Sequence, residues 1–313
     1  MKVLVTGADG FVGQWLVQAL LGAGHAVTGA VRDGRPMPGR LTPGQLATVR
    51  WVPLDLEDTV SIQALAQEPV DGVIHLAAVA SSVEAGRDPA HAWAVNAAGT
   101  AKLVESFATG GGTAGRMLVV STGEVYGPGE PRPRLETDPV NPVSPYAASK
   151  AAAEIAAIEA GRRTGLAVVV ARPFPHTGPG QTTTYVAPAF LDRIRVAQRT
   201  GAVAVKTGNL DPVRELLDVR DVAEAYLILL ERGRAGEVYN VARGEGIAIG
   251  DLFERLAAAA GVRVFPEPDP SFLRATDVPH LVGDPAKINT ETGWKATRPL
   301  DQTLRDLVDA QAH

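Results

Sequence analysis

The chain has 313 residues, of which 45% are hydrophobic and 21% are charged, and its formal net charge is −5. This composition is typical of a globular protein, and the acidic balance without a long basic run gives no electrostatic basis for nucleic-acid binding. The absence of cysteine from the sequence excludes disulfides and thiolate chemistry. No run reaches the roughly 18 apolar residues of a membrane span, and residues 2–6 are too short for the apolar core of a signal peptide. We therefore expect a cytoplasmic protein.

Short β-branched runs alternate with helix-like segments through the first 171 residues. Such alternation predicts βαβ units and a parallel sheet with helices on both faces. The runs are continuously apolar, which is typical of strands buried on both sides. The expected strands are 3–6, 26–31, 49–52, 72–76, 117–121 and 166–171, and the expected helices lie near 11–23, 59–67, 89–108 and 145–163.

After residue 171 this rhythm changes, and loops rich in proline and glycine separate the elements. Helices are expected near 186–199, 222–231, 249–260 and from about 299, with strands near 202–208 and 237–241. The predicted fold class is α/β, a Rossmann-type doubly wound parallel sheet with a smaller interleaved α/β domain. The nucleotide-binding domain is expected at 1–171 plus about 219–243, and the substrate-binding domain at 172–218 plus about 244–313.

The stretch TGADGFVG places three glycines between the first expected strand and the first expected helix. Glycine permits the tight turn and lets the backbone approach a pyrophosphate, while the helix N-terminus faces the anion. We expect a dinucleotide cofactor at this turn, in contact with Gly7, Asp9, Gly10, Phe11, Val12 and Gly13.

The end of the second strand indicates the type of cofactor. An acidic residue there takes the ribose hydroxyls of NAD, but this strand ends in Val31 and Arg32. An arginine pairs well with a 2′-phosphate, so NADP(H) is favoured over NAD(H), although Asp33 keeps NAD(H) open. Asp55, just past the third strand, is a candidate adenine contact or a helix N-cap.

Tyr146 and Lys150 lie four residues apart in SPYAASK, which places them on one face of a helix whose start Pro145 fixes. A lysine ammonium near a phenol favours the phenolate, and such a tyrosine exchanges protons with a carbonyl oxygen. Thr122 and Glu124 follow the fifth strand, at the edge where open α/β sheets bind ligands.

These segments, together with DLED, HLAA, VNAAGT, STGEVYG and RPF, resemble the extended short-chain dehydrogenase/reductase family. The resemblance implies a catalytic triad of Thr122, Tyr146 and Lys150, nucleotide-sugar substrates, and a homodimer that packs through a helix bundle. It also implies that Tyr146 donates the proton and that Lys150 binds the nicotinamide ribose. Further cofactor contacts are expected from Leu56, Leu76, Ala77, Ala78, Asn96 and Pro173.

Three reactions remain open within this family: reduction of a keto sugar, 4,6-dehydration and C4 epimerisation. Dehydratases place acidic residues beside the triad threonine. Here Gly123 occupies one such place, whereas Glu124 keeps dehydration open or orients the substrate.

The second half, including FPHTGPGQ and GEVYNVARGEGIAI, resembles the GDP-4-keto-6-deoxy-D-mannose reductases of this family. The resemblance implies NADP(H)-dependent reduction of the C4 ketone to GDP-D-rhamnose, without a metal. Asp218 and Asp221 are expected to fix a loop and cap a helix. Two departures are Pro175, where relatives carry asparagine, and Glu215, where they carry aspartate. The expected substrate contacts are Glu124, Pro175, His176, Gln181, Lys206, Arg214 and Arg274.

Overall fold

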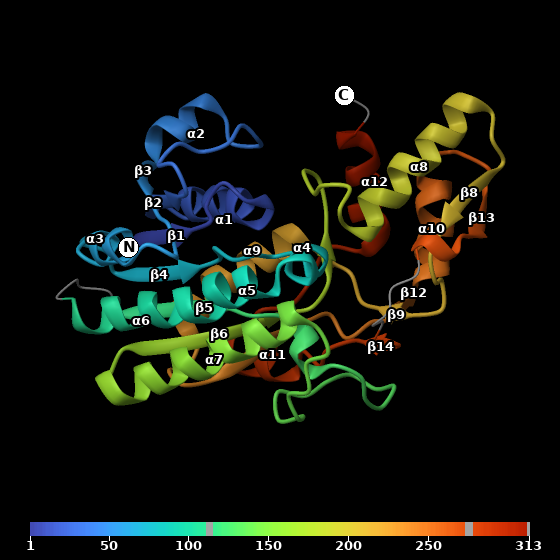
Figure 1. Cartoon of the computed structure of the whole chain (residues 1–313). Coiled ribbons are helices and arrows are strands. Elements are labelled where there is room, and N and C mark those ends of the chain that lie inside the picture. Colours follow the sequence, from blue (N-terminus) through green and yellow to red (C-terminus); the bar gives the residue numbers. More distant parts are fainter. Residues whose placement is uncertain (111–114, 273–277, 312–313) are drawn as a thin grey trace.

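The computed structural model describes residues 1–110, 115–272 and 278–311. Its centre is a seven-stranded parallel sheet in the order β11-β6-β5-β4-β1-β2-β3 (Figure 1). The strand order reverses between β1 and β4, and open sheets of this kind bind ligands where the carboxyl ends of such strands diverge. The strands are β1 (Lys2–Thr6), β2 (Ala26–Val31), β3 (Arg50–Pro53), β4 (Gly72–His75), β5 (Arg116–Val120), β6 (Ala167–Pro173) and β11 (Val238–Val241).

Helices cover both faces of this sheet, because its strands carry apolar side chains on both sides. Val3 and Val5 of β1 belong to the core shared with α1 and α9, whereas Leu4 between them belongs to the core on the opposite face. The first face carries α1 (Phe11–Gly22), α9 (Val219–Arg232) and α11 (Ala286–Thr292), and the second carries α3 (Thr59–Leu65), α6 (Thr100–Thr109) and α7 (Pro145–Thr164). The predicted doubly wound α/β fold is thereby confirmed.

The helix expected near 89–108 is interrupted. The chain forms α5 (Pro89–Ala92), a π-helical segment η1 (Trp93–Gly99) and then α6. Such π-helical insertions are frequent at functional sites. Three short helices, α2 (Pro43–Thr48), α4 (Ser82–Arg87) and α11, were not predicted, and the first two begin at side-chain caps that short loops supply.

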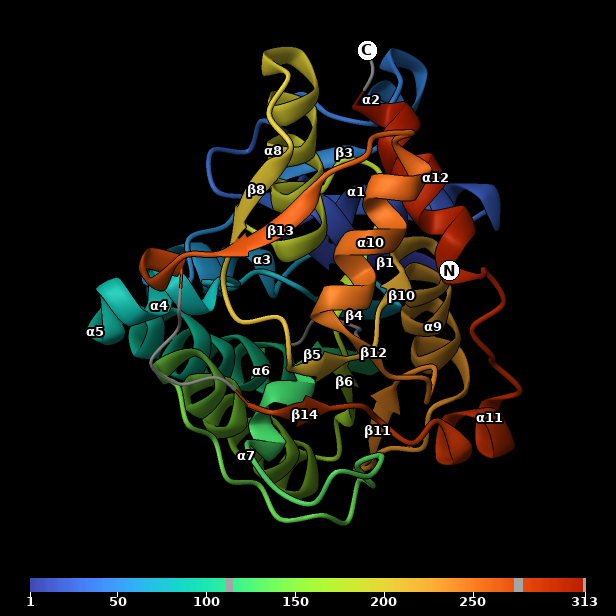
Figure 2. The ribbon, with the colours of Figure 1, turned by 90° about the vertical axis from the view of Figure 1, so that its right-hand side faces the viewer.

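A second group of elements, here called the C-terminal lobe, packs around three helices: α8 (Val186–Thr200), α10 (Ile249–Ala259) and α12 (Leu300–Ala310). Its core includes Phe190, whose ring meets Phe253 edge-on with centroids 5.4 Å apart. Figure 2 shows strands β8 (Ala204–Thr207) and β13 (Phe265–Pro268) side by side in this lobe. Strand β9 (Val213–Arg214) lies between β12 (Ile247–Ala248) and β14 (His280–Leu281).

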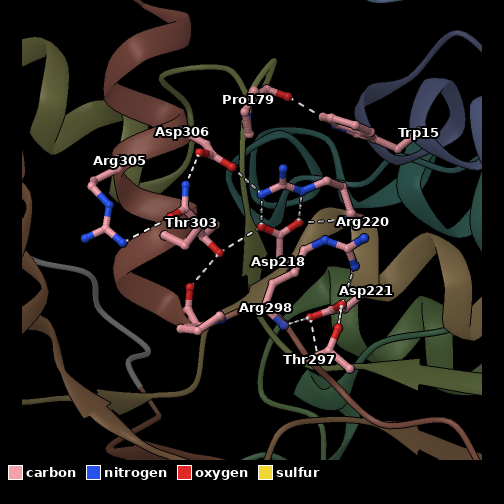
Figure 3. A network of polar contacts seen from close by, with 12 residues as sticks. Trp15, Pro179, Asp218, Arg220, Asp221, Thr297, Arg298, Thr303, Arg305 and Asp306 are labelled. Atoms are coloured by element: carbon pink, nitrogen blue, oxygen red, sulfur yellow. Dashed lines mark hydrogen bonds and ion pairs between the residues drawn. The ribbon is translucent and has the colours of Figure 1, made fainter.

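Two aspartates at the start of α9 join the lobe to the sheet (Figure 3). Asp218 caps the helix by accepting from the backbone N–H of Arg220 at 2.8 Å, and it also accepts from Thr303 Oγ1 of α12 at 2.8 Å. Asp221 accepts from the backbone N–H groups of Thr297 and Arg298. The capping and loop-fixing roles predicted for these two aspartates are confirmed.

Within the described ranges, no helix combines the length and the apolar character that crossing a bilayer requires.

Candidate active site

The glycine turn between β1 and α1 is shaped for the close approach of an anion. Gly7 has a φ of +67°, and a Cβ there would lie 3.0 Å from the backbone nitrogen of Ala77. A Cβ on Gly13 would overlap the carbonyl oxygen of Gly7. Gly10 is the N-cap of α1, and among the described residues no side chain caps this helix. The first-turn N–H groups are therefore available to a pyrophosphate, so the turn fits a dinucleotide.

Thr6 and the buried His75 hold the loop after β4 next to the glycine turn. Thr6 Oγ1 accepts from the backbone N–H groups of Leu76 and Ala77, at 3.2 and 3.1 Å, so its own proton is directed to Nδ1 of His75 at 2.8 Å. Nε2 of His75 therefore donates to Thr100 Oγ1 at 3.0 Å. Burial, together with the charge of Lys150, lowers the pKa of His75 to about 3, so the ring is neutral at pH 7. Ala78, the last of the three cofactor contacts predicted in this loop, is half-buried beside Ala77.

The loop after β2 folds back over the start of α1. Asp9 accepts from the backbone N–H of Met37 at 3.2 Å, and the guanidinium of Arg40 stacks on Trp15 at 3.6 Å. Arg32 and Asp33 are both exposed directly after the strand. Their predicted roles in choosing between NADP and NAD stay predictions.

Two further predicted cofactor residues are engaged with protein. Asp55 Oδ1 accepts from the backbone N–H of Glu57 at 2.9 Å, and the neighbouring Leu56 is buried. Asn96 in η1 is fully buried, and its amide accepts from Val79 N at 2.8 Å and donates to Ser149 Oγ at 3.0 Å. Asn96 thus ties the loop after β4 to α7, and a direct contact with the cofactor stays a prediction.

Tyr146 and Lys150 lie on the first turns of α7, as predicted. Ser144 caps this helix by accepting from the backbone N–H of Ala147 at 3.1 Å, and Pro145 occupies the first helical position. Thr122, which caps the short helix η2 (Gly123–Tyr126), hydrogen-bonds the phenol of Tyr146. Lys150 is 3% exposed. The structure therefore brings the three predicted catalytic residues together.

The pKa of Tyr146 moves in the direction opposite to the one expected. Burial raises the pKa of Tyr146, and the charge of Glu124 and the nearby phenol of Tyr185 act in the same direction, while the hydrogen bond from Thr122 opposes them. The expectation that Lys150 lowers this pKa is wrong for the protein without cofactor, because desolvation dominates. Burial also lowers the pKa of Lys150 to about 8, against the effect of Glu154. Tyr146 is therefore protonated at neutral pH, and this is the form that can donate a proton.

Glu124 lies beside this triad in a polar cluster that the sequence did not reveal. Its Oε2 accepts from Ser82 Oγ at 3.1 Å, and Tyr185, just before α8, donates to the carbonyl of Ala80 at 3.4 Å. Ser82 begins α4, four residues after the end of the HLAA segment, and this position after β4 was the signal that could have found it. Tyr185 therefore joins the lobe to the loop that follows β4.

Gly123 sits against the ring of Phe174, whose nearest carbon would lie 3.1 Å from a Cβ at position 123. A side chain at this position would require the ring of the fully buried Phe174 to shift by a few tenths of an ångström. Glycine at this position leaves the chain without the second carboxylate next to Thr122 that the dehydratase pattern requires.

The loop after β6 is rigid because its polar groups bind one another. Nδ1 of His176 donates to the carbonyl of Phe174 at 3.0 Å, and Gln181 donates to the carbonyl of His176 at 3.0 Å. The ring of His176 stacks on Phe11 of the glycine turn, with centroids 6.2 Å apart. The side chain of Gln181 thus shapes the loop. Trp15 fastens the loop to α1 by donating to the carbonyl of Pro179 at 3.1 Å.

Pro173 and Pro175, at the start of this loop, have different settings. Pro173 ends β6 and is buried, and Pro175 is half-buried. The carbonyl of Pro175 accepts from the backbone N–H of Leu217 at 3.0 Å, which aligns the short strands β7 (His176–Thr177) and β10 (Leu217–Asp218). At position 175 the chain therefore uses its backbone to join two strands.

The basic residues predicted to bind substrate are spread over the lobe. Arg214 on β9 is half-buried and donates to the carbonyl of Val213 at 2.9 Å, whereas Lys206 is exposed and pairs with Asp269 at 2.9 Å. Arg274 lies outside the described residues. Glu215 is fully buried and accepts from the backbone N–H groups of Arg243, Gly244 and Gly283. Glu215 therefore fixes the loops beside Arg214.

Comparison with known proteins identifies the family. The model of the NAD dependent epimerase/dehydratase family matches residues 3–242. The chain belongs to this family. A nicotinamide dinucleotide is accordingly the class of cofactor for this epimerase/dehydratase-family protein, and the contacts that hold it stay predictions.

Individual relatives are similar over nearly the whole chain. This family member is 36% identical to GDP-6-deoxy-D-mannose reductase of Pseudomonas aeruginosa over 310 residues, which cover 98% of this chain and 96% of that protein. The structure of RMD from Pseudomonas aeruginosa complexed with NADPH matches with a TM-score of 0.83 and 35% identity, and covers 99% of this chain and 98% of that one. UDP-glucose 4-epimerase from Thermotoga maritima, with UDP-glucose, matches with a TM-score of 0.88 and 28% identity over 100% and 99% of the two chains.

Proposed function

We propose that this protein reduces the C4 ketone of GDP-4-keto-6-deoxy-D-mannose to GDP-D-rhamnose with NADPH. The similarity to GDP-6-deoxy-D-mannose reductase over 98% of the chain is the observation that carries the proposal. Gly123, packed against Phe174, supports reduction over dehydration, because the chain has no acidic side chain at this place beside Thr122. NADP(H) is proposed over NAD(H) because Arg32 follows β2 and because the RMD structure contains NADPH.

The cofactor would lie along the glycine turn, where Gly7, Gly10 and Gly13 leave backbone surface open and the first N–H groups of α1 meet its pyrophosphate. Once bound, NADPH supplies the hydride that C4 of the sugar accepts. Lys150 would hold the nicotinamide ribose, and Arg32 would pair with the 2′-phosphate.

The residues of the triad divide the proton chemistry between them. Thr122 would hydrogen-bond the oxygen at C4, and Tyr146 would donate its phenolic proton to this oxygen as charge develops there. Tyr146 is protonated before the reaction, as a general acid must be. Glu124, held by Ser82, would orient a sugar hydroxyl. Arg214 would bind the diphosphate, because a guanidinium matches phosphate oxygens with paired hydrogen bonds.

The proposal is tested by following NADPH oxidation with GDP-4-keto-6-deoxy-D-mannose and identifying the product sugar. We expect stoichiometric NADPH loss and GDP-D-rhamnose. Turnover of a dTDP- or UDP-linked keto sugar, with none of the GDP sugar, would overturn the assignment of the base. Activity on intact GDP-mannose or a UDP-hexose without added reductant would instead identify a dehydratase or an epimerase.

We propose that two copies of the chain associate through α7. Ile155 on this helix is 71% exposed, which places it among the most exposed large apolar side chains of the described residues. A shallow hollow of about 560 Å³ surrounds it, lined by Ile155, Ile158, Glu159, Arg162 and Arg163. Helices packed against this face would form the helix bundle predicted from the sequence.

The division into a cofactor domain (1–171 plus about 219–243) and a substrate domain (172–218 plus about 244–313) is also part of the proposal. The separate core around α8, α10 and α12 supports it. The cytoplasmic location expected from the sequence stays a prediction.

A further inference from the structure

A buried ion pair lies one helical turn beyond the catalytic lysine. The guanidinium of Arg172, near the end of β6, contacts Glu154 of α7 through Nε at 3.0 Å from Oε1 and through Nη2 at 2.7 Å from Oε2. Their side chains are only 6% and 5% exposed. This paired geometry is the strongest form of an arginine–carboxylate contact, and so deep a position is costly unless both charges are matched.

Glu154 follows Lys150 by four residues and Tyr146 by eight, so the three side chains lie along one face of α7. Arg172 stands at the end of this row. Its Nη1 also donates to the phenolic oxygen of Tyr126 at 3.0 Å, in the same short helix η2 that Thr122 caps. Arg172 therefore contacts both the helix that carries Tyr146 and Lys150 and the turn that carries Thr122.

We propose that Arg172 is a positioning residue that takes up the charge of Glu154 and so leaves the ammonium of Lys150 available to Tyr146 and the nicotinamide ribose. The proposal rests on the catalytic role given to Lys150 in the proposed function. It adds a second requirement, that the nearby carboxylate of Glu154 on α7 is also paired with the guanidinium of Arg172.

The charges around Lys150 show why such sharing matters. Burial lowers the pKa of Lys150 to about 8, and Glu154 is the group that opposes this effect. From β4 the buried ring of His75 also faces Lys150, but it is neutral at pH 7. The other ionisable groups around the row are the phenols of Tyr146 on α7 and Tyr126 on η2, whose pKa burial raises, and the carboxylate of Glu124 on η2, whose charge acts on Tyr146. Both phenols are uncharged at pH 7, and Glu124 acts at the Tyr146 end of the row, so Glu154 and Arg172 are the charges that set the balance at Lys150.

Removing Glu154 and removing Arg172 should shift the pKa of Lys150 in opposite directions. In Glu154→Gln, Lys150 loses its carboxylate and is left near an unmatched guanidinium, so its pKa should fall. In Arg172→Met, the carboxylate turns fully to Lys150, so its pKa should rise. A charge within about 4–6 Å typically moves a pKa by about 1–3 pH units. The double variant Glu154→Gln/Arg172→Met should return close to the wild type.

The test is a pH titration of Lys150 by NMR of protein with ¹³C-labelled lysine, assigned with Lys150→Arg and recorded without substrate. Tyr126→Phe is the matched control, because it removes a neutral partner of Arg172 and leaves the ion pair in place. Its Lys150 titration should match the wild type. The high-pH limb of kcat for NADPH oxidation should shift in the same direction as each titration.

Opposite shifts in the two single variants support the proposal. An unchanged Lys150 titration in either folded variant, or shifts in the same direction, overturns it. If Arg172→Met does not fold, Glu154→Gln alone tests the proposal, because the proposal requires the pKa of Lys150 to fall in that variant. The titration needs no turnover. A protein that fails to reduce the GDP sugar, but whose two single variants shift the pKa of Lys150 in opposite directions, would contradict the proposed function and support this inference.

Discussion

The hydroxyl of Ser82, at the start of α4, lies 3.1 Å from Oε2 of Glu124, two residues after Thr122. The contact joins the loops that follow β4 and β5, at the carboxyl edge of the sheet. It holds a carboxylate next to the position where the sugar is expected. Two roles are open to this carboxylate: orienting a sugar hydroxyl, or taking part in dehydration.

Replacing Glu124 with glutamine keeps the shape of this cluster and removes its charge. If Glu124 orients a sugar hydroxyl, kcat/KM for the keto sugar should fall about 10- to 100-fold, the usual worth of one hydrogen bond to a charged group. Ser82→Ala should cost only a few-fold, since the carboxylate stays. Product analysis with GDP-mannose and NADP⁺ is the check on the alternative role. A 4-keto product that the wild type forms and Glu124→Gln does not would show that Glu124 takes part in dehydration.

Tyr146→Phe removes the proposed proton donor and its hydrogen bond to Thr122. Because general acid catalysis typically contributes about 10²–10⁴-fold, kcat should fall by that factor while the fold persists. Tyr239→Phe is the control, since this hydroxyl contacts Glu291 on α11, on one helix-covered face of the sheet. Steady-state NADPH oxidation measures both variants. A Tyr146→Phe protein with more than a tenth of the wild-type kcat would contradict the acid role.

Arg32→Ala tests the choice of cofactor. The loss of a charged partner for the 2′-phosphate should raise KM for NADPH about 10- to 100-fold and leave KM for NADH nearly unchanged. Arg50→Ala is the comparison, because Arg50 is also an exposed arginine but lies at the amino end of β3. An unchanged ratio of the two KM values in Arg32→Ala would mean that another group recognises the phosphate.

His75 should make the protein less stable in mild acid. Its pKa is about 3 in the folded protein and 6.5 when unperturbed, so the unfolded chain binds a proton between these values that the native chain does not. The contribution of neutral His75 is complete above pH 6.5 and is lost as the pH falls toward 3, by roughly 5 kcal/mol at most. Urea unfolding at pH 7.5 and 5 should show this loss, and His75→Gln should reduce the difference between the two conditions. An equal loss of stability between pH 7.5 and 5 in the wild type and in His75→Gln would be evidence against this contribution of His75.

Ile155→Asp places a charge on the exposed face of α7 and should convert the proposed dimer into a monomer. Light scattering during size-exclusion chromatography measures the mass directly. Val60→Asp is the matched control, since Val60 on α3 is equally exposed, at 72% compared with 71% for Ile155. A monomeric wild type, or a dimeric Ile155→Asp, would rule out this interface.

The sheet and the order of its helices could be predicted because their signals are local. Each strand is a short apolar run, and the Gly7–Gly13 turn and the Tyr146–Lys150 spacing are read within a few residues. The cap and proline at the start of α7 are likewise encoded by neighbouring positions, Ser144 and Pro145. Local signals also explain why the element boundaries agree closely with the structure.

The features that escaped prediction depend on partners far along the chain. Thr6 meets His75 across 69 positions, and Tyr126 meets Asn240 across 114. The direction of the Tyr146 pKa could not be predicted because it depends on burial by elements that surround α7 in space. The π-helical segment η1 carries a continuous helical pattern in the sequence, and the interruption at Asn96 coincides with a tertiary contact to Val79.

The capping of α9 has a consequence for synthesis of the chain. Asp218 and Arg220 at its first turn are held by Thr303 and Asp306 of α12, which lie 85 and 86 positions later. A ribosome makes the chain from its amino end, and folding units generally form in that order. The sheet and α9 can emerge early, but the polar contacts that complete the start of α9 form only after α12 has been made. The nascent chain therefore closes this junction as one of its last steps.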